Sequence, residues 1–426
     1  MTAAVLSIGT ELTRGELVNS NAAWLSEQLT SLGLEVRHHS TLADDLDGIA
    51  TELSRLCQTA NVVVATGGLG PTSDDLTAKA VAKACGVGLV RDEPSWERIK
   101  KRYRARGLVV TALHAKQADL PEGAEALPNP VGSAPGFAIA HGNAKAFFMP
   151  GVPREMKAIF ESSVIAAIAK LGQRDSYQVH IRSFGLRESE VGEMLEDIEG
   201  VNGDITLGYR AHFPELEVKV LARAATAAEA EQRAKTIAEQ VRDRLGDAVY
   251  GERDDTFNAV VGEHLRDRGL TLAVAESCTG GMVGAMLTAV PGSSEYLLFD
   301  AVTYANSAKT NVLGVSPDTL RGYGAVSSET AAAMAEGARR VAGSDIAVST
   351  TGVAGPGGGT DEKPVGTVWF GLATPEGTHT FRHLLHGDRE QIRTRAAYIA
   401  LELVRRYAMG KPVSEGPFQS TCDQKT

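Results

Sequence analysis

Short apolar runs alternate with amphipathic stretches along the first 165 residues of the chain. The apolar runs predict buried strands, and the stretches whose hydrophobic positions recur three and four residues apart predict helices. Such alternation is typical of an α/β fold in which helices cover a parallel sheet. The predicted strands span residues 5–8 and 62–66, and the predicted helices span residues 22–32, 75–85 and 154–171.

Residues 175–250 predict a small α+β module. Within it, Gly200 and Gly203 match the G-x-x-G loop with which KH domains clamp a nucleic-acid backbone. From Arg187 to Asp204, however, seven carboxylates accompany one basic residue, and this charge balance repels phosphate. We therefore expect a spacer or dimerisation module, and not a nucleic-acid site. Its predicted strands span residues 178–184 and 217–222, and its predicted helices span 188–198 and 227–245.

A second α/β block begins near residue 256. Strands and helices alternate again, and the turn residues from 374 to 378 predict a β-hairpin near its end. The residues after 410 are polar and rich in Pro and Gly, which is typical of a frayed terminus. The predicted strands span 270–275, 296–303, 345–350, 366–373 and 378–384, and the predicted helices span 257–268, 279–290, 328–341 and 389–407.

The length of 426 residues agrees with two to four domains. We predict an α/β domain at 1–171, the α+β module at 172–252, a second α/β domain at 253–410 and a flexible tail at 411–426. Because 53 acidic residues outnumber 43 basic ones, nucleic acid and anionic membranes are disfavoured as the main partners.

The chain lacks the signals of a secreted or membrane protein. It has no apolar span of about 18 residues. Its four cysteines lie far apart without C-x-x-C spacing, so they predict neither a zinc site nor a disulfide framework. We expect a cytoplasmic protein.

A glycine-rich loop at residues 66–72 follows an apolar strand of the first block, and Asp74 and Asp75 come directly after it. Ligands of open α/β sheets bind at the carboxyl ends of the strands. Loop N–H groups suit a phosphate, but two carboxylates would repel it unless a divalent cation such as Mg²⁺ lay between them. Alternatively, the carboxylates only cap the next helix. The loop glycines that we expect to bind substrate are Gly67, Gly68 and Gly70.

Two further loops should reach the same sheet edge if the strands are parallel. One contains Gly9 and Glu11, and the other contains Gly151 and Arg154. Arg154 stands at a predicted helix start, where a guanidinium is able to bind a phosphate with two hydrogen bonds. The alternative for Arg154 is a solvated surface position.

In the second block, Ser277 follows an apolar strand and precedes a glycine-rich helix start, which is how many nucleophiles are presented. Tyr304 and Lys309 follow the next strand. A buried lysine whose pKa is lowered is able to take the serine proton, and Tyr304 could orient that lysine or relay the proton. The amides expected to stabilise an oxyanion belong to Thr279, Gly280 and Gly281.

Each of these residues also has a structural interpretation. Ser277 suits a helix N-cap, Tyr304 a core position and Lys309 a solvated helix face. Cys278 is a rival nucleophile, although a buried thiol is the commoner role. A further loop, with Gly352 and Gly355, lacks the lysine and serine of a P-loop and is expected to hold one phosphate or to shape a pocket wall. Arg389 and Arg393 are weaker phosphate candidates.

Ordered motifs in both blocks resemble the CinA (competence/damage-inducible) family, whose first domain is similar to the MoaB and MogA proteins. In the first block they are Gly9-Thr-Glu11, Gly15-Glu-Leu-Val-Asn-Ser-Asn21, Thr66-Gly-Gly-Leu-Gly-Pro-Thr-Ser-Asp-Asp75, Gly132-Ser-Ala-Pro-Gly136 and Pro150-Gly-Val-Pro-Arg154. In the second block they are Ala275-Glu-Ser-Cys-Thr-Gly-Gly281, Tyr304-Ala-Asn-Ser-Ala-Lys309, Gly352-Val-Ala-Gly-Pro-Gly-Gly358 and Lys363-Pro-Val-Gly-Thr367. One departure is Glu11-Leu-Thr-Arg-Gly15, where relatives often have Glu-Leu-Leu-Gly.

The resemblance implies two hydrolytic activities. The first domain would be a metal-dependent ADP-ribose pyrophosphatase that releases AMP and ribose 5-phosphate. The last domain would be a PncC-type amidase that converts nicotinamide mononucleotide to nicotinate mononucleotide and ammonia without a cofactor. Ser277 would be its nucleophile, with Lys309 and Tyr304 as the base system. We also expect a homodimer. Two rivals stay open: a non-catalytic nucleotide- or pterin-binding protein, and molybdenum-cofactor handling by the first domain.

Overall fold

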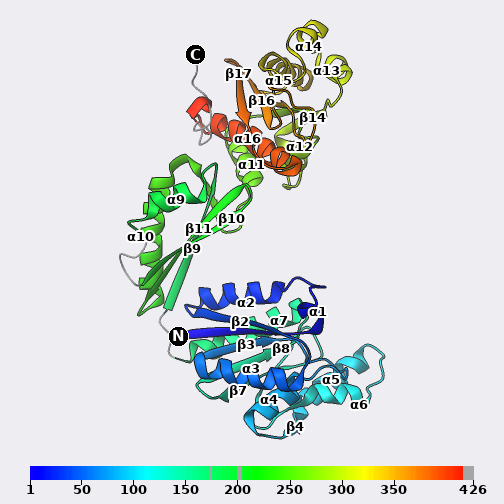
Figure 1. Cartoon of the computed structure of the whole chain (residues 1–426), viewed down its shortest axis with the longest axis vertical. Coiled ribbons are helices and arrows are strands. Elements are labelled where there is room, and N and C mark those ends of the chain that lie inside the picture. The colour runs from blue at the N-terminus through cyan, green and yellow to red at the C-terminus, as the bar shows by residue number, and fades with distance from the viewer. Residues whose placement is uncertain (172–174, 199–203, 416–426) are drawn as a thin grey trace. The chain divides into compact units, whose positions relative to one another are not determined.

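The computed structural model describes residues 1–171, 175–198 and 204–415 (Figure 1). Contacts divide the chain into two units, Met1–Gln178 with Leu221–Ala234 and Val179–Val220 with Lys235–Thr426. The described residues form sheets of six, four, five and two strands. The predicted α/β fold class is confirmed.

The first domain is built on the six-stranded sheet. Its strands are β1 (Thr2–Ile8), β2 (Glu35–Leu42), β3 (Val62–Thr66), β6 (Glu125–Leu127), β7 (Gly136–His141) and β8 (Ala144–Met149), and its helices are α1 (Thr10–Thr13), α2 (Ser20–Ser31), α3 (Leu46–Thr59), α4 (Thr77–Cys85), α7 (Pro153–Ile159) and α8 (Ile165–Ala169), with a π-helical turn, η2 (Phe160–Val164), between the last two. The strand order is β2-β1-β3-β8-β7-β6. The first four strands are parallel, and β7 and β6 are antiparallel additions. Helices α2 and α7 cover one face of the sheet, and α3 and α4 cover the other (Figure 1). Their buried residues belong to two separate clusters.

A small lobe that the sequence pattern did not predict follows α4. It contains β4 (Leu89–Arg91), α5 (Glu93–Ala105), α6 (Ala112–Ala115), the 3-10 turn η1 (Lys116–Ala118) and β5 (Asp119–Pro121), with β4 and β5 antiparallel. Lys116 Nζ donates a hydrogen bond to the carbonyl of Thr72. The lobe therefore contacts the glycine-rich loop that was predicted to bind substrate.

The middle module contains a four-stranded sheet of order β10-β11-β9-β12. Its elements are β9 (Asp175–Phe184), α9 (Glu188–Leu195), β10 (Ile205–His212), β11 (Glu215–Ala224), α10 (Ala227–Leu245), η3 (Gly246–Ala248) and β12 (Val249–Glu252). The sequence pattern missed β10 and β12. The predicted G-x-x-G loop at 200–203 lies outside the described residues, as do residues 416–426 of the predicted tail, while 413–415 form the 3-10 turn η5 (Val413–Glu415).

The last domain has a five-stranded sheet of order β14-β13-β15-β16-β17. Its elements are α11 (Phe257–Asp267), β13 (Leu272–Glu276), α12 (Met282–Thr288), η4 (Ser293–Glu295), β14 (Leu297–Val302), α13 (Asn306–Leu313), α14 (Pro317–Tyr323), α15 (Ser328–Ala342), β15 (Ile346–Gly352), β16 (Thr367–Thr374), β17 (Gly377–Leu384) and α16 (Arg389–Ala408). β13, β14 and β15 are parallel, and the predicted hairpin joins β16 to β17. Helices α11, α12 and α16 contribute to the core on one face, and α13 and α15 to that on the other. Among the described helices, none is long and apolar enough to cross a membrane.

Candidate active site

Ser277 lies at the carboxyl end of β13, the strand between β14 and β15. Its amide donates to the carbonyl of Thr350 on β15 (2.9 Å), so the turn is held against the neighbouring strand. The serine is only 9% exposed. Parallel pairing thus brings the predicted nucleophile to the sheet edge where ligands of open α/β sheets bind.

Lys309 reaches Ser277 from the first turn of α13. Its Nζ lies 3.1 Å from Ser277 Oγ, 2.8 Å from the carbonyl oxygen of Thr303 and 3.3 Å from that of Tyr304. The lysine is 1% exposed, and this burial lowers its pKa below the usual 10.5. An ammonium would donate to all three oxygens. The neutral amine, which a general base requires, would donate to the two carbonyls and accept the serine proton with its lone pair.

Tyr304 contacts Lys309 through its backbone and not through its side chain. Its carbonyl accepts a hydrogen bond from Lys309, whereas its hydroxyl accepts one from Arg389 Nη2 (3.1 Å). Arg389 Nη1 also donates to the carbonyl of Gly355 (2.6 Å). The side chain of Tyr304 therefore contacts the arginine, and its backbone orients the lysine.

Two of the three amides predicted to stabilise an oxyanion need correction. The amide of Gly280 donates to the carbonyl of Ser277 (3.2 Å), and that of Gly281 donates to Glu276 Oε2 (2.9 Å). For Gly281 the reason is the fully buried Glu276, which also accepts the amide of Gly284 and so caps the start of α12. Of the three predicted amides, that of Thr279 remains a candidate.

A cavity of about 210 Å³ opens beside the serine and the lysine. Its lining comprises Ser277, Cys278, Tyr304, Lys309, Ala325, Val326, Thr351, Gly352, Ala354 and Arg389. Gly352 therefore lies in the wall of the cavity, and the carbonyl of Gly355 accepts a hydrogen bond from the lining residue Arg389. Burial raises the pKa of Cys278 to about 12, which makes this thiol a poor rival to the serine.

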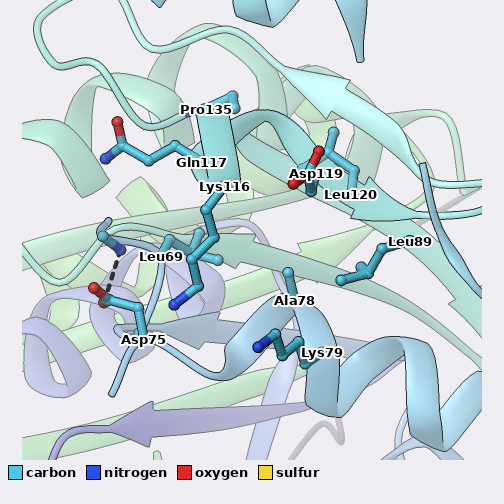
Figure 2. A pocket seen from close by; sticks show the side chains of 12 residues that line it. Leu69, Asp75, Ala78, Lys79, Leu89, Lys116, Gln117, Asp119, Leu120 and Pro135 are labelled. Atoms are coloured by element: carbon cyan, nitrogen blue, oxygen red, sulfur yellow. Dashed lines mark hydrogen bonds between the residues drawn. The ribbon is translucent and has the colours of Figure 1, made fainter. Parts of the chain in front are cut away.

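A second cavity, of about 60 Å³, lies beside the glycine-rich loop of the first domain (Figure 2). It is lined by Gly68, Leu69, Gly70, Asp75, Ala78, Lys79, Leu89, Lys116, Gln117, Asp119, Leu120 and Pro135. Figure 2 shows the ammonium groups of Lys79 and Lys116 pointing toward the region below Leu69. The sequence pattern predicted neither lysine, and Lys116 lies 44 positions beyond the loop residue that it contacts.

The carboxylate of Asp75, a predicted metal ligand, is engaged in the fold of the loop. Its carboxylate accepts the amides of Gly70 (2.7 Å) and Thr72 (2.8 Å), which engages both oxygens in folding the loop. The helix begins only at Thr77, so helix capping is not its role either. Asp74 is exposed. The main cause that lowers its pKa is a hydrogen bond from the side chain of Thr72.

The described side chains of the first domain offer too few ligands to hold a metal ion by themselves. Within residues 1–171, 175–198 and 204–415, no three His, Cys, Asp or Glu side chains are grouped closely enough to hold an ion. Mg²⁺ commonly binds through one or two carboxylates together with substrate phosphates and water. Asp74 with the oxygens of a bound diphosphate is therefore the arrangement that these residues allow.

The loops at Gly9 and Gly151 meet the loop at Gly67, as parallel pairing of β1, β3 and β8 predicts. A Cβ on Gly67, whose φ is +109°, would lie 1.9 Å from the carbonyl oxygen of Ile8, so only glycine fits there. Glu11 folds back against Gly9, and Arg154 is exposed. None of Gly9, Glu11, Gly67, Gly151 and Arg154 lines the cavity of Figure 2.

The fold and the site define a multidomain α/β protein with a buried serine–lysine pair. Three family models match it: "Probable molybdopterin binding domain" at residues 4–170, "Damage-inducible protein CinA KH domain" at 178–251 and "CinA C-terminal domain" at 254–408. The chain is 43% identical over 410 residues to the CinA-like protein of Desulfosudis oleivorans, which covers 95% of this chain and 99% of that one. The chain belongs to the CinA family, and this membership suggests hydrolase activity.

Two further relatives carry the same family name. The CinA-like protein of Geobacter sulfurreducens is 43% identical over 411 residues, covering 95% of this chain and 99% of its own. A crystal structure of CinA from Thermoplasma acidophilum, titled as a protein with unknown function, is 38% identical and covers 40% of this chain and 96% of its own, with a TM-score of 0.37.

Proposed function

We propose that the last domain hydrolyses the amide of nicotinamide mononucleotide. Ser277 Oγ attacks the carboxamide carbon while its proton passes to Lys309 Nζ. Lys309 then returns the proton to the departing nitrogen, and ammonia leaves as the C–N bond breaks. Water hydrolyses the resulting ester of Ser277 and yields nicotinate mononucleotide.

One observation carries this proposal: the 3.1 Å approach of Lys309 Nζ to Ser277 Oγ in a buried site. Burial disfavours the ammonium form and lowers the lysine pKa, so a larger fraction of Lys309 is neutral and able to accept the serine proton. The cavity beside the pair gives a substrate access to the serine. The choice of nicotinamide mononucleotide as the substrate rests on the resemblance of these motifs to the amidase domain.

Ammonia release from nicotinamide mononucleotide tests the amidase proposal. We expect turnover by the full-length protein in the presence of a chelator, and a loss of at least a thousandfold in Ser277→Ala. Ser294→Ala changes an exposed serine of the same domain and serves as the control. Undiminished turnover by Ser277→Ala would refute the role of the serine.

We infer a second activity for the first domain, hydrolysis of ADP-ribose to AMP and ribose 5-phosphate. The specific observation in its favour is the cavity in which Lys79 and Lys116 lie beside a glycine-rich loop, because two cations suit a diphosphate. A divalent ion, held by Asp74 and the diphosphate oxygens, would neutralise phosphate charge. Asp75 would keep the loop in place.

AMP release with and without a chelator tests this second activity. We expect dependence on added Mg²⁺, and loss of rate in Asp74→Asn and in Asp75→Asn, the latter through the folding of the loop. A full rate in Asp74→Asn would exclude the metal role of Asp74. If the protein binds ADP-ribose or a pterin and releases no AMP, the domain is a binding module instead.

A further inference from the structure

We infer that Arg389 binds the phosphate of the nucleotide in the amidase cavity and that the hydroxyl of Tyr304 holds it in place for this role. The inference rests on the proposed amidase function and deepens it by naming the part of the substrate that is recognised. Its substrate class is a nicotinamide nucleotide with a free phosphomonoester, as opposed to the unphosphorylated riboside.

The charges around the cavity single out Arg389. Among the ten lining residues, only Lys309 and Arg389 carry basic side chains. Lys309 is buried against Ser277, and its burial disfavours the charged form. In the part of the chain that the structure describes, no carboxylate lies within 4.0 Å of the Arg389 guanidinium. The positive charge of Arg389 is thus available for an anionic substrate group.

The geometry of Arg389 also leaves donors for a ligand. Its Nη1 donates to the carbonyl of Gly355 and its Nη2 to the hydroxyl of Tyr304. A guanidinium has five N–H donors, so these two contacts fix its plane and leave others for phosphate oxygens. The neighbouring carboxylate of Asp388 accepts the amide of Gln391 at the start of α16.

The contacts of Tyr304 separate this role from that of a proton relay. Tyr304 is 60% exposed, and its hydroxyl accepts a hydrogen bond from Arg389, whereas only its backbone carbonyl accepts one from Lys309. Removing the hydroxyl therefore frees Arg389 and leaves the bond between the carbonyl and the lysine intact. Tyr304 is a positioning residue for the phosphate-binding arginine.

Steady-state ammonia release from nicotinamide mononucleotide and from nicotinamide riboside tests the inference in wild type, Arg389→Ala, Arg389→Lys and Tyr304→Phe. For Arg389→Ala we expect kcat/KM for the mononucleotide to fall roughly ten- to hundredfold, mainly through KM, because charge-assisted hydrogen bonds are lost. The value for the riboside should stay within about twofold of wild type. Arg389→Lys should lose less, and Tyr304→Phe should show a smaller loss with the same selectivity. Arg321→Ala, an exposed arginine of α14, is the matched control.

Equal losses on both substrates in Arg389→Ala would overturn the inference while leaving the amidase function standing. A fall in kcat on both substrates in Tyr304→Phe would instead support a proton relay and overturn the positioning role. If wild type releases no ammonia, the amidase proposal fails. Calorimetric titration of wild type and Arg389→Ala with the mononucleotide and with the riboside then tests by itself whether Arg389 binds the phosphate. Weaker binding of the mononucleotide, but not of the riboside, to Arg389→Ala would then support phosphate binding, and equal binding would overturn it.

Discussion

At the residue scale, the contacts of Lys309 explain why a lysine replaces the more usual histidine as the proposed base. Two carbonyl oxygens and one hydroxyl surround its Nζ. Lys309 is buried, so its ammonium form would lose its contact with water, and this loss costs free energy. The neutral amine satisfies the same contacts without that cost.

The proposed role of Lys309 predicts a pH dependence. We expect kcat/KM for the mononucleotide to rise with pH and to level off at a pKa below the usual 10.5 of lysine, because activity needs the neutral amine. Rates measured across this range on wild type check the prediction. A rate that falls as pH rises toward 10 would contradict it.

The lowered pKa of Lys309 also makes the stability of the folded protein depend on pH. Between the lowered pKa of folded Lys309 and 10.5, the unfolded chain binds a proton that the folded chain does not. Wild type should therefore gain stability relative to Lys309→Met as pH rises through this window. Urea unfolding of both proteins at several pH values measures the difference.

At the scale of single elements, strand β17 contains a titrating group that packs against its neighbour. The ring of His383 lies 5.6 Å from that of Phe370 on β16, and burial lowers the pKa of His383 to about 4. At pH values below 6.5, the usual pKa of histidine, His383 binds a proton in the unfolded chain but not in the folded strand. The stability present above pH 6.5 should therefore be lost as pH falls toward 4.

The free energies of unfolding of wild type and His383→Gln at pH 7 and pH 4.5 check this prediction. Wild type should lose about 2 to 3 kcal/mol more than the variant, since each pKa unit corresponds to about 1.4 kcal/mol. A parallel loss in both proteins would mean that His383 is protonated in the folded state.

The elements also show what the sequence could reveal. Helix α10 (Ala227–Leu245) has the bounds that its apolar period predicted, and so does β3 (Val62–Thr66). Strands β2 and β10, at the edges of their sheets, were missed because edge strands carry many polar residues. Ser277 and Lys309 could be predicted because each follows a strand end. The contact between Arg389 and Tyr304 joins residues 85 positions apart, which no local pattern reveals.

At the scale of the whole molecule, the middle module and the last domain share buried contacts within the second unit. Phe184 and Tyr250 of the module belong to the same core as Phe257 of the last domain. Arg405 on α16 pairs with Glu402 (2.7 Å) and donates to the carbonyl of Asp247, although Arg405 and Glu402 are each only 2% exposed. These contacts tie α16 to the end of the module.

Breaking this buried pair should destabilise the second unit. Arg405→Met leaves the carboxylate of Glu402 buried without its partner, which costs about 3 to 5 kcal/mol. Urea unfolding of the full chain measures the loss, and the double variant Arg405→Met with Glu402→Met should recover most of it. A loss that is equally large in the double variant would show that the charge pair is not the cause.

The central claim is that Ser277 carries the acyl group during amide hydrolysis. Acid-quenched protein, mixed for a short time with nicotinamide mononucleotide, should show by mass spectrometry a nicotinate mononucleotide adduct on the peptide that contains Ser277. Ser277→Ala should show no adduct and release no ammonia. Ammonia release by Ser277→Ala, or an adduct located on Cys278, would contradict the account.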